Sequence, residues 1–273
     1  MKRLCLVVGL VAAVIFPVRV SWAQQLAPAN AMGVRMCHLH LSAADPEASR
    51  EFWLMVGGTL TTHGPAAPLV IFPGVIIAVS NRVPIGTNDG SIVDHVGFVA
   101  RNGLELLRKL QAASVTVTMD TSSRGGSFYS PEGLKVEIRE DPSLATPIAF
   151  DYVQLRVAEP ATVSAMQAWY VTTFGAQAGV AADGTPIATI PGVTLRLAEA
   201  ASAVSPVGRA LDHFGFEIRN LEGFCMKTNG YGGAKPNCAY RYDEGDKAGI
   251  TRISDPWGLS IELNEGYEFG VYP

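Results

Sequence analysis

The 273-residue chain lacks any cluster of positive charge, and it has a single long apolar run. Its 21 lysine and arginine residues are scattered, and the formal net charge is −4. Nucleic acids and anionic membranes attract proteins through clustered positive charge, so neither is an expected partner. Beyond the N-terminus, no segment approaches the roughly 20 apolar residues that a membrane-spanning helix needs. These absences argue against a nucleic-acid-binding protein and against a membrane span in the body of the chain.

The single apolar run has the pattern of a signal peptide over residues 1–23. Lys2 and Arg3 precede an apolar core at residues 4–16, and Ser21-Trp22-Ala23 fits a small-x-small cleavage site. A membrane anchor is the rival interpretation, but the run is shorter than a spanning helix and is followed by Pro17 and Arg19. We therefore expect a periplasmic or secreted protein, either a monomer or a homodimer, with no membrane association after cleavage.

Cysteine is scarce, with three residues left after the expected cleavage: Cys37, Cys225 and Cys238. An exported location favours disulfides. Cys225 and Cys238 both lie in the last quarter of the chain and are the better candidates for a bridge, although the sequence leaves open whether it forms. Cys37 would then be a buried thiol.

The sequence contains an internal repeat at residues that could carry chemistry. Val-Asp-His-Val-Gly-Phe at 93–98 returns as Leu-Asp-His-Phe-Gly-Phe at 211–216. Ser-Pro-Glu-Gly at 130–133, followed by Glu137, returns as Asp-Pro-Trp-Gly at 255–258, followed by Glu262. The repeat predicts two similar domains at 33–141 and 150–266, joined by a linker at 142–149 and followed by a tail at 267–273.

Each half divides again into a strand, a helix and further strands, which makes the expected fold class α+β. In the first half the opening strands are 36–41 and 94–99, and helices follow Asp45-Pro46 and Asn102. In the second half the opening strands are 151–155 and 212–218, and helices follow Glu159-Pro160 and Asn220. The closing strands are expected at 75–79, 134–138, 193–197 and 259–263.

Strand parity predicts where the polar side chains point. Side chains alternate between the two faces of a strand, so His38 and His40 share one face and Cys37, Leu39 and Leu41 share the other. By the same argument His95 and Glu137 point inward, because Val96, Phe98, Val136 and Ile138 pack outward. A single inward histidine is most often a hydrogen-bonded core residue, which is the interpretation for His40.

The repeated Asp-His-(Val/Phe)-Gly-Phe strands and the (Ser/Asp)-Pro-x-Gly-x-x-x-Glu closings resemble the vicinal oxygen chelate superfamily. It includes glyoxalase I, the extradiol dioxygenases, and the fosfomycin- and bleomycin-resistance proteins. The resemblance implies four βαβββ modules that form two open, cupped mixed-sheet barrels. The family's metal-ligand positions fall on His38, His95 and Glu137, and in the second half on Tyr152, His213 and Glu262.

Departures from the family's pattern limit the expected site. Tyr152 is a poor ligand because a phenol with a pKa near 10 stays protonated. The fourth-ligand positions of the family are Ala78 and Arg196, so a site with four family ligands is not expected. Two imidazoles and one carboxylate suit Fe(II) or Mn(II), and Zn(II) is also possible.

The order in which the modules pair decides which residues meet. First-with-second pairing, which we favour, joins His38, His95 and Glu137. It leaves Tyr152, His213 and Glu262 as a degenerate second site, in which tyrosine replaces one metal ligand. First-with-fourth pairing joins His38, His213 and Glu262, and leaves Tyr152 with His95 and Glu137. Either arrangement provides one intact three-ligand site.

The functional prediction is an exported metal-dependent enzyme acting on a small oxygen-chelating substrate. A dioxygenase-like reaction at Fe(II) is favoured, and a lyase- or isomerase-like reaction comes next. Arg156, Arg196 and Tyr240 could form the substrate-binding surface; alternatively, the arginines pair with acids such as Glu217 and Glu262. The competing function is a metal-free protein that binds a small ligand, as bleomycin-resistance proteins do.

Overall fold

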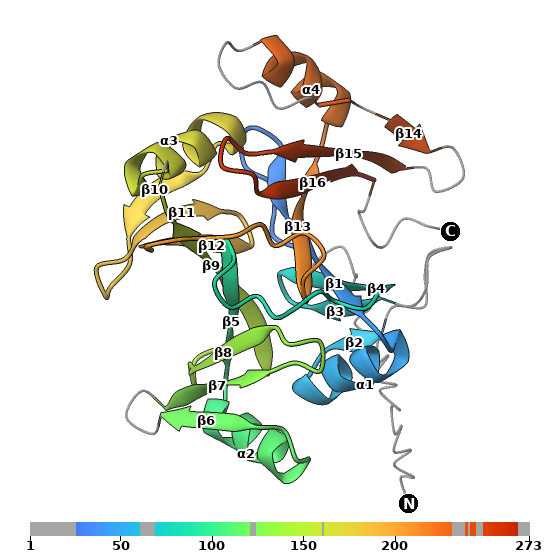
Figure 1. Ribbon diagram of the computed structural model, residues 1–273, viewed down its shortest axis with the longest axis vertical. Helices are drawn as coiled ribbons and strands as arrows, with labels where there is room; N and C mark the ends of the chain where they lie inside the picture. Colours follow the sequence, from blue (N-terminus) through green and yellow to red (C-terminus); the bar gives the residue numbers. More distant parts are fainter. Residues whose placement is uncertain are drawn as a thin grey trace, which may run out of the picture.

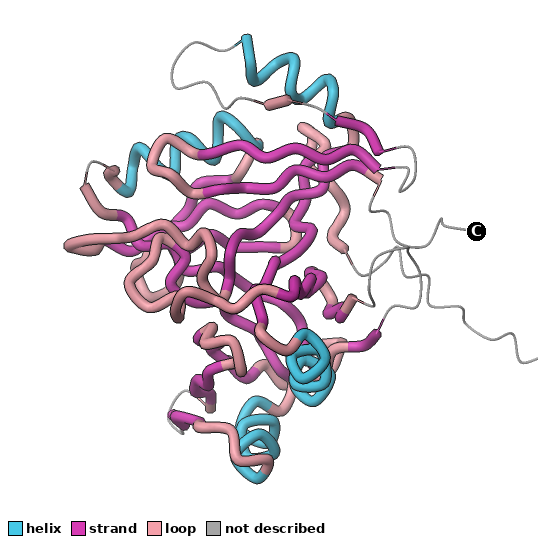
Figure 2. Tube along the Cα trace, turned by 45° about the vertical axis from the view of Figure 1, so that its right-hand side comes forward, coloured by secondary structure: helices cyan, strands magenta, loops and turns pink. Residues whose placement is uncertain are grey.

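The computed structural model describes residues 26–60, 69–120, 124–159, 161–230, 238–239, 241–243 and 248–266. Strands occupy the middle of the molecule and the helices lie at its periphery (Figure 1, Figure 2). Within the described residues, no helix is long and apolar enough to cross a membrane. The predicted signal peptide and the tail at 267–273 lie outside the described residues, as does Tyr240.

The chain forms four consecutive modules, each with one strand, one helix and three further strands. The first contains β1 (Val34–Ala43), α1 (Pro46–Val56), β2 (Thr59–Leu60), β3 (Val70–Phe72) and β4 (Val75–Asn81). The second contains β5 (Val93–Ala100), α2 (Gly103–Ala112), β6 (Val117–Asp120), β7 (Gly125–Tyr129) and β8 (Lys135–Glu140). The third contains β9 (Ile148–Val157), α3 (Val163–Phe174), β10 (Gln177–Val180), β11 (Pro186–Ile190) and β12 (Val193–Glu199). The fourth contains β13 (Leu211–Ile218), α4 (Leu221–Gly230), β14 (Arg241–Asp243), β15 (Ala248–Ser254) and β16 (Ser260–Glu265).

The first two helices begin close to the predicted residues, and the third begins later. Asp45 caps α1, and its Oδ1 accepts hydrogen bonds from the backbone of Glu47 and Ala48, both at 3.1 Å. Asn102 precedes α2 without a side-chain capping bond. The start of α3 at Glu159-Pro160 was wrong, because the cap is Thr162, whose Oγ1 accepts from the backbone of Ala165 at 3.2 Å.

The modules combine into two eight-stranded mixed sheets that interleave the two halves of the chain. One sheet, with the order β14-β15-β16-β13-β1-β4-β3-β2, joins the first and fourth modules; we call it the outer-module sheet. The other, with the order β10-β11-β12-β9-β5-β8-β7-β6, joins the second and third modules; we call it the inner-module sheet. The modules of each sheet meet through their opening strands, β1 with β13 and β5 with β9, both antiparallel.

This topology corrects the favoured pairing of the first module with the second. The alternative, first with fourth, is the arrangement observed, and each half of the chain gives one module to each sheet. Strand parity predicts the face to which a side chain points, but it does not predict which opening strand pairs with β1. The opening strands β5 and β13 carry nearly the same sequence, so either could have met β1.

The apolar faces of the strands pack against the helices as predicted. Leu39 and Leu41 are fully buried in the main core together with Trp53 of α1.

Cys37 does not pack with Leu39 and Leu41, although strand parity predicted that the three side chains share one face. It lies at a register irregularity of β1 between Met36 and His38, and it packs with Leu26, Ile71 and Ile76 apart from the main core. The thiol of Cys37 is free and buried, as expected. Cys225 and Cys238 form a disulfide, which ties α4 to the segment before β14.

The turn between β15 and β16 contains a carboxyl group in an unfavourable environment. Asp255 Oδ1 accepts hydrogen bonds from the backbone of Trp257 at 3.0 Å and of Leu259 at 2.8 Å. Its Oδ2 is buried and has no hydrogen-bond partner within the described residues. Burial raises the pKa of Asp255 to about 6, against the opposing effect of the backbone amides.

Asp255→Asn is therefore expected to stabilise the fold at neutral pH. A raised pKa means that the folded chain holds this proton more tightly than the unfolded chain. The free energy of unfolding consequently falls as the pH rises from about 4 to about 6, and it stays reduced above that window. Asparagine keeps the Oδ1 acceptor without the charge, and the gain at pH 7.5 is at most about 3 kcal/mol.

Urea titrations of both proteins at pH 4 and pH 7.5 measure this effect. Glu51→Gln, which neutralises an exposed carboxylate of α1, is the control and should change the stability little. Equal stability of Asp255→Asn and the unmodified chain at pH 7.5 would contradict the burial argument.

Candidate metal site

The outer-module sheet brings together two histidines and a glutamate from three strands. In its register, His38 of β1 lies opposite Gly215 of β13, and Gly215 lies opposite Glu262 of β16. A Cβ atom at Gly215 would lie 2.2 Å from Cε1 of His38. Glycine at this position therefore leaves the space that the His38 ring occupies. This is the role that the repeated His-x-Gly spacing has in the fold.

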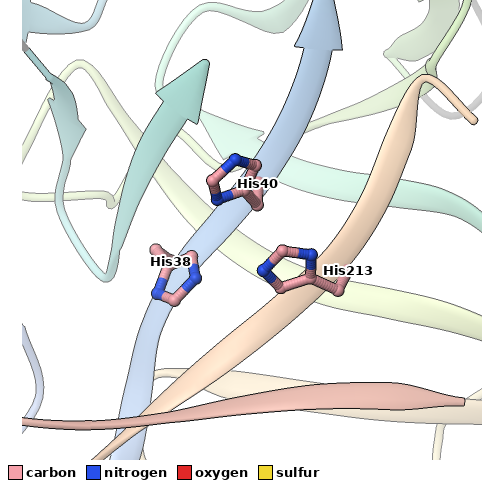
Figure 3. A group of neighbouring side chains, drawn as sticks. All are labelled: His38, His40 and His213. Atoms are coloured by element: carbon pink, nitrogen blue, oxygen red, sulfur yellow. The ribbon is translucent and has the colours of Figure 1, made fainter. Parts of the chain in front are cut away.

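The ligand-type atoms of this group converge on one buried space. His38 Nε2 lies 3.5 Å from Glu262 Oε1, and His213 Nε2 lies 3.2 Å from Glu262 Oε2. His40, two residues after His38 on β1, lies opposite His213 in the register. The ligand atoms of the three histidines all lie within 4.8 Å of one another (Figure 3). The sequence interpretation of His40 as a hydrogen-bonded core residue neglects its shared parity with His38, which places it on this face.

A bulge next to each of the repeated histidines supplies a second partner for the imidazole. In β13 the pairing with β1 steps from His213 to Leu211, so Asp212 is the extra residue. Asp212 Oδ1 accepts a hydrogen bond from His213 Nδ1 at 2.6 Å. Bulges of this kind re-aim side chains near functional sites. A carboxylate on Nδ1 fixes the ring and leaves Nε2 directed at Glu262.

Hydrogen bonds and burial have opposite effects on the three histidines. Burial opposes protonation of His213, but the hydrogen bonds to Asp212 and Glu262 raise its pKa. Burial controls the protonation of the other two rings. It lowers the pKa of His38 to about 3 and the pKa of His40 to about 4, despite the nearby charge of Glu262. Both rings are therefore neutral at physiological pH, which is the form that binds metal ions. Burial opposes ionisation of Glu262, but the hydrogen bond from His213 and the charges around it hold the pKa of this carboxyl well below its usual range.

These residues fit a divalent metal ion. His38 Nε2 is buried and has no hydrogen-bond partner within the described residues. A buried nitrogen with a lone pair usually has a donor or an ion beside it, and this one faces a carboxylate and a second imidazole. One cation already lies at the edge of the group, because Arg252 Nη2 of β15 donates to Glu262 Oε2 at 2.9 Å. Its side chain is 52% exposed, so it can turn into solvent when an ion binds.

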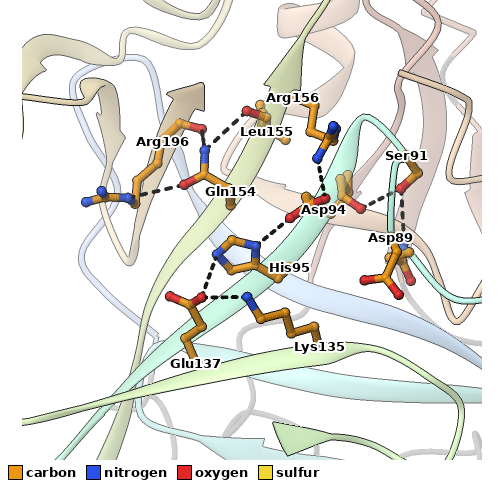
Figure 4. A network of polar contacts seen from close by, with 12 residues as sticks. Asp89, Ser91, Asp94, His95, Lys135, Glu137, Gln154, Leu155, Arg156 and Arg196 are labelled. Carbon is orange, nitrogen blue, oxygen red and sulfur yellow. Dashed lines mark hydrogen bonds and ion pairs between the residues drawn. The ribbon is translucent and has the colours of Figure 1, made fainter. Parts of the chain in front are cut away.

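The inner-module sheet has the matching arrangement with different chemistry. Gly97 lies opposite both Tyr152 of β9 and Glu137 of β8, and a Cβ at Gly97 would lie 1.9 Å from the Tyr152 ring. The Tyr152 hydroxyl donates to Glu137 Oε2 at 2.6 Å, and Lys135 Nζ donates to Oε1 at 2.8 Å. His95 Nε2 lies 3.5 Å from the same Oε1 (Figure 4). Burial, reinforced by Glu137, raises the pKa of Tyr152 far above its usual value, so the phenol stays protonated.

The inner-module sheet does not fit a metal ion, because Lys135 and Tyr152 already donate hydrogen bonds to both oxygens of the Glu137 carboxylate. The favoured set of His38, His95 and Glu137 is not brought together, because His38 belongs to the other sheet. The physical reason is the module pairing, since His95 and His213 occupy matching positions in different sheets. The alternative set of His38, His213 and Glu262 is the one that the topology assembles.

The arginines singled out from the sequence pair with acids other than those expected. Arg156 Nη1 donates to Asp94 Oδ1 at 3.1 Å. Arg196 forms an ion pair with Asp183, and its guanidinium lies 5.2 Å from the centre of the Tyr152 ring. Glu262 pairs instead with Arg252, which the sequence did not indicate because it depends on the register of β15 with β16. The substrate-binding role of Arg156, Arg196 and Tyr240 stays a prediction.

Comparison with known proteins identifies the fold. No protein-family model matches the sequence, and a comparison with curated protein sequences gives no match. A glyoxalase I variant from Zea mays is 14% identical, with a TM-score of 0.63 over 87% of this chain and 95% of that one. A putative dioxygenase from Bacillus subtilis is 15% identical, with a TM-score of 0.57 over 85% of each chain. The chain thus has the fold of the vicinal oxygen chelate superfamily, as the repeated motifs predicted.

Proposed function

We propose that this protein is a metal-dependent enzyme whose site is formed by His38, His213 and Glu262. The observation that carries the proposal is the buried Nε2 of His38, which lacks a hydrogen-bond partner within the described residues and faces the carboxylate of Glu262. Two imidazoles and one carboxylate suit Fe(II) or Mn(II), with Zn(II) as a further possibility. When bound, such an ion supplies Lewis-acid polarisation of a substrate oxygen.

The surrounding residues have distinct roles in this proposal. Asp212 holds His213 in one tautomer, and burial keeps His38 and His40 neutral. Arg252 would leave Glu262 and remain at the open edge of the site, where its charge can hold an anionic oxygen of the substrate. The proposed substrate class, a small molecule with two adjacent oxygen donors, comes from the resemblance to the vicinal oxygen chelate superfamily. The reaction is either dioxygenase-like or lyase- or isomerase-like.

A metal-free protein that binds a small ligand is the second candidate. It is favoured by the inner-module sheet, where Lys135 and Tyr152 occupy the lone pairs of Glu137. Arg252 makes a similar contact with Glu262, and in this alternative it would stay in place. The two candidates differ in whether the imidazoles of the outer-module sheet ever bind an ion.

We further propose that the protein acts outside the cytoplasm. The Cys225–Cys238 disulfide supports this location, because disulfides persist in oxidising compartments. The pattern of residues 1–23 supports it from the sequence, although these residues lie outside the described part of the chain.

Metal analysis of the protein, purified anaerobically without chelators, tests the proposal. We expect about one Fe or Mn per chain, and removal of the ion should lower the melting temperature and abolish turnover of chelating substrates. Ligand binding at 1,000 times the Kd stabilises a fold by about 4 kcal/mol, so the shift should be easily measured. A folded protein that contains no metal and takes up no Fe(II), Mn(II) or Zn(II) would leave the metal-free binding function in its place.

A further inference from the structure

We propose that His40 is a fourth protein ligand of the metal, which makes the site a centre of three histidines and one glutamate. This inference rests on the proposed function, since it concerns the same ion. It goes beyond the proposed three-ligand set, which does not include His40, because the sequence analysis interpreted His40 as a core residue.

The position of His40 is consistent with ligation. It points to the same face as His38, and its ring centre lies 4.6 Å from that of His213 and 6.2 Å from that of His38. Across the parallel pair of β1 and β4, its register neighbour is Ala78. The methyl group of Ala78 leaves this part of the face to the imidazole.

The contacts of His40 do not match those of a structural histidine. Within the described residues, its ring makes contacts with His38 and His213 but no side-chain hydrogen bond. A structural histidine usually holds at least one nitrogen in a hydrogen bond, whereas the partly buried His40 has no such side-chain partner among the described residues. An ion bound among the three rings would serve His40, His38 and His213 together.

The separations of the nitrogens fit one shared ion after a small contraction. Metal–nitrogen bonds of about 2.1 Å place opposite ligands about 4.2 Å apart and neighbouring ligands about 3 Å apart. The ligand atoms of the three histidines lie within 4.8 Å of one another. A movement of each nitrogen by up to about one ångström, within the reach of side-chain torsions, closes the remaining difference.

The inner-module sheet provides a natural comparison. Its residue at the position of His40 is Gln154, which lies opposite His95 as His40 lies opposite His213. Gln154 Nε2 donates to the backbone oxygens of Arg196 at 3.1 Å and of Leu155 at 3.3 Å. Side-chain hydrogen bonds thus hold the matching position in the sheet that does not fit a metal. In the sheet that does, no such bond holds the His40 ring among the residues that the structure describes.

A fourth ligand narrows the substrate and the reaction. An octahedral ion held by four protein atoms keeps two open positions, whereas one held by three keeps three. Two positions accept a single bidentate oxygen chelator and leave none for dioxygen beside it. His40 therefore favours the lyase- or isomerase-like branch of the proposed function over the dioxygenase-like branch.

Co(II) binding to the metal-depleted full chain tests the proposal without measuring activity. We expect His40→Ala to weaken Co(II) binding by about 100-fold or more, because even the loss of an outer partner of a ligand costs about 10- to 100-fold. The visible absorption of bound Co(II) should also change with the coordination number. Gln154→Ala is the matched control and should leave both quantities unchanged.

A second measurement covers the case in which His40→Ala fails to fold. X-ray absorption of the Co(II)-loaded wild-type protein counts the imidazoles directly, and three are expected. Two imidazoles, or an unchanged affinity and spectrum in a folded His40→Ala variant, would overturn this inference and leave the three-ligand site standing. No Co(II) binding by the wild-type protein would instead overturn the proposed function itself.

Discussion

His213→Ala is expected to abolish metal binding, whereas His95→Ala at the matching position should leave it intact. His213 is 1% exposed, and its Nε2 is directed at Glu262 while Asp212 holds its Nδ1. Loss of this ligand should weaken binding by more than the ~100-fold typical of an outer partner. The metal content should fall from about one ion per chain to a small fraction, measured by elemental analysis after dialysis.

His95→Ala is a close control because its surroundings are so similar. His95 follows Asp94 on a bulge of the same kind, and Asp94 Oδ2 lies 2.7 Å from its Nδ1. The Nε2 of His95 also faces a glutamate, at 3.5 Å. If His95→Ala releases the metal as completely as His213→Ala does, the assignment of the ion to the outer-module sheet is wrong. Thermal unfolding of both variants checks that neither effect is a loss of fold.

The combined change of Tyr152→His and Lys135→Ser is expected to create a second metal site in the inner-module sheet. Tyr152 stands where His38 stands in the other sheet, and Gly97 already leaves room for a ring. Lys135 precedes Glu137 by two residues, as Ser260 precedes Glu262, so serine reproduces the native pattern of the outer-module sheet. The metal content should rise from about one ion per chain to about two.

The single changes separate the two contributions. Lys135→Ser alone removes the cation from Glu137 but provides no second imidazole, so the content should stay near one ion per chain. Tyr152→His alone provides the imidazole but leaves the ammonium of Lys135 on the carboxylate, and the added binding should be weak. A content that remains at one ion per chain in the double variant would mean that the two sheets differ in more than these residues.

The sequence predicted most of the local structure because strands, caps and parity depend on neighbouring residues. The alternation of side chains along the strands predicted the burial of Val136 and Phe98, and the residue type of Asp45 predicted its role as a helix cap. The α+β fold of four modules followed from the repeated motifs and is confirmed by the sheets. The start of α3 was misplaced because Thr162, a second capping residue, lies just beyond Glu159-Pro160.

The composition of the candidate site was harder to predict because it depends on contacts between distant strands. His38 and His213 meet only because β1 lies against β13, and nothing within either strand specifies that choice. Arg252 reaches Glu262 through the cross-strand register of β15 and β16, which leaves no motif in the sequence. Lys135 lies two residues before Glu137 on the same strand and on the same face, but strand parity does not show that its ammonium group would occupy the carboxylate. Strict alternation would place Asp212 on the face opposite to His213, and the bulge that turns Asp212 toward His213 breaks that alternation.

The interleaving of the two halves has a consequence for how such a chain can evolve. If each half were a separate copy of one polypeptide, the same strand pairing would make an intertwined dimer, and symmetry would make its two sites identical. Every substitution would then alter both sites at once. In the fused chain each residue occurs a single time, so Tyr152 and Lys135 can occupy one site while His38 and Ser260 occupy the other. Fusion thus frees one site to lose or change its chemistry while its duplicate keeps the original ligands.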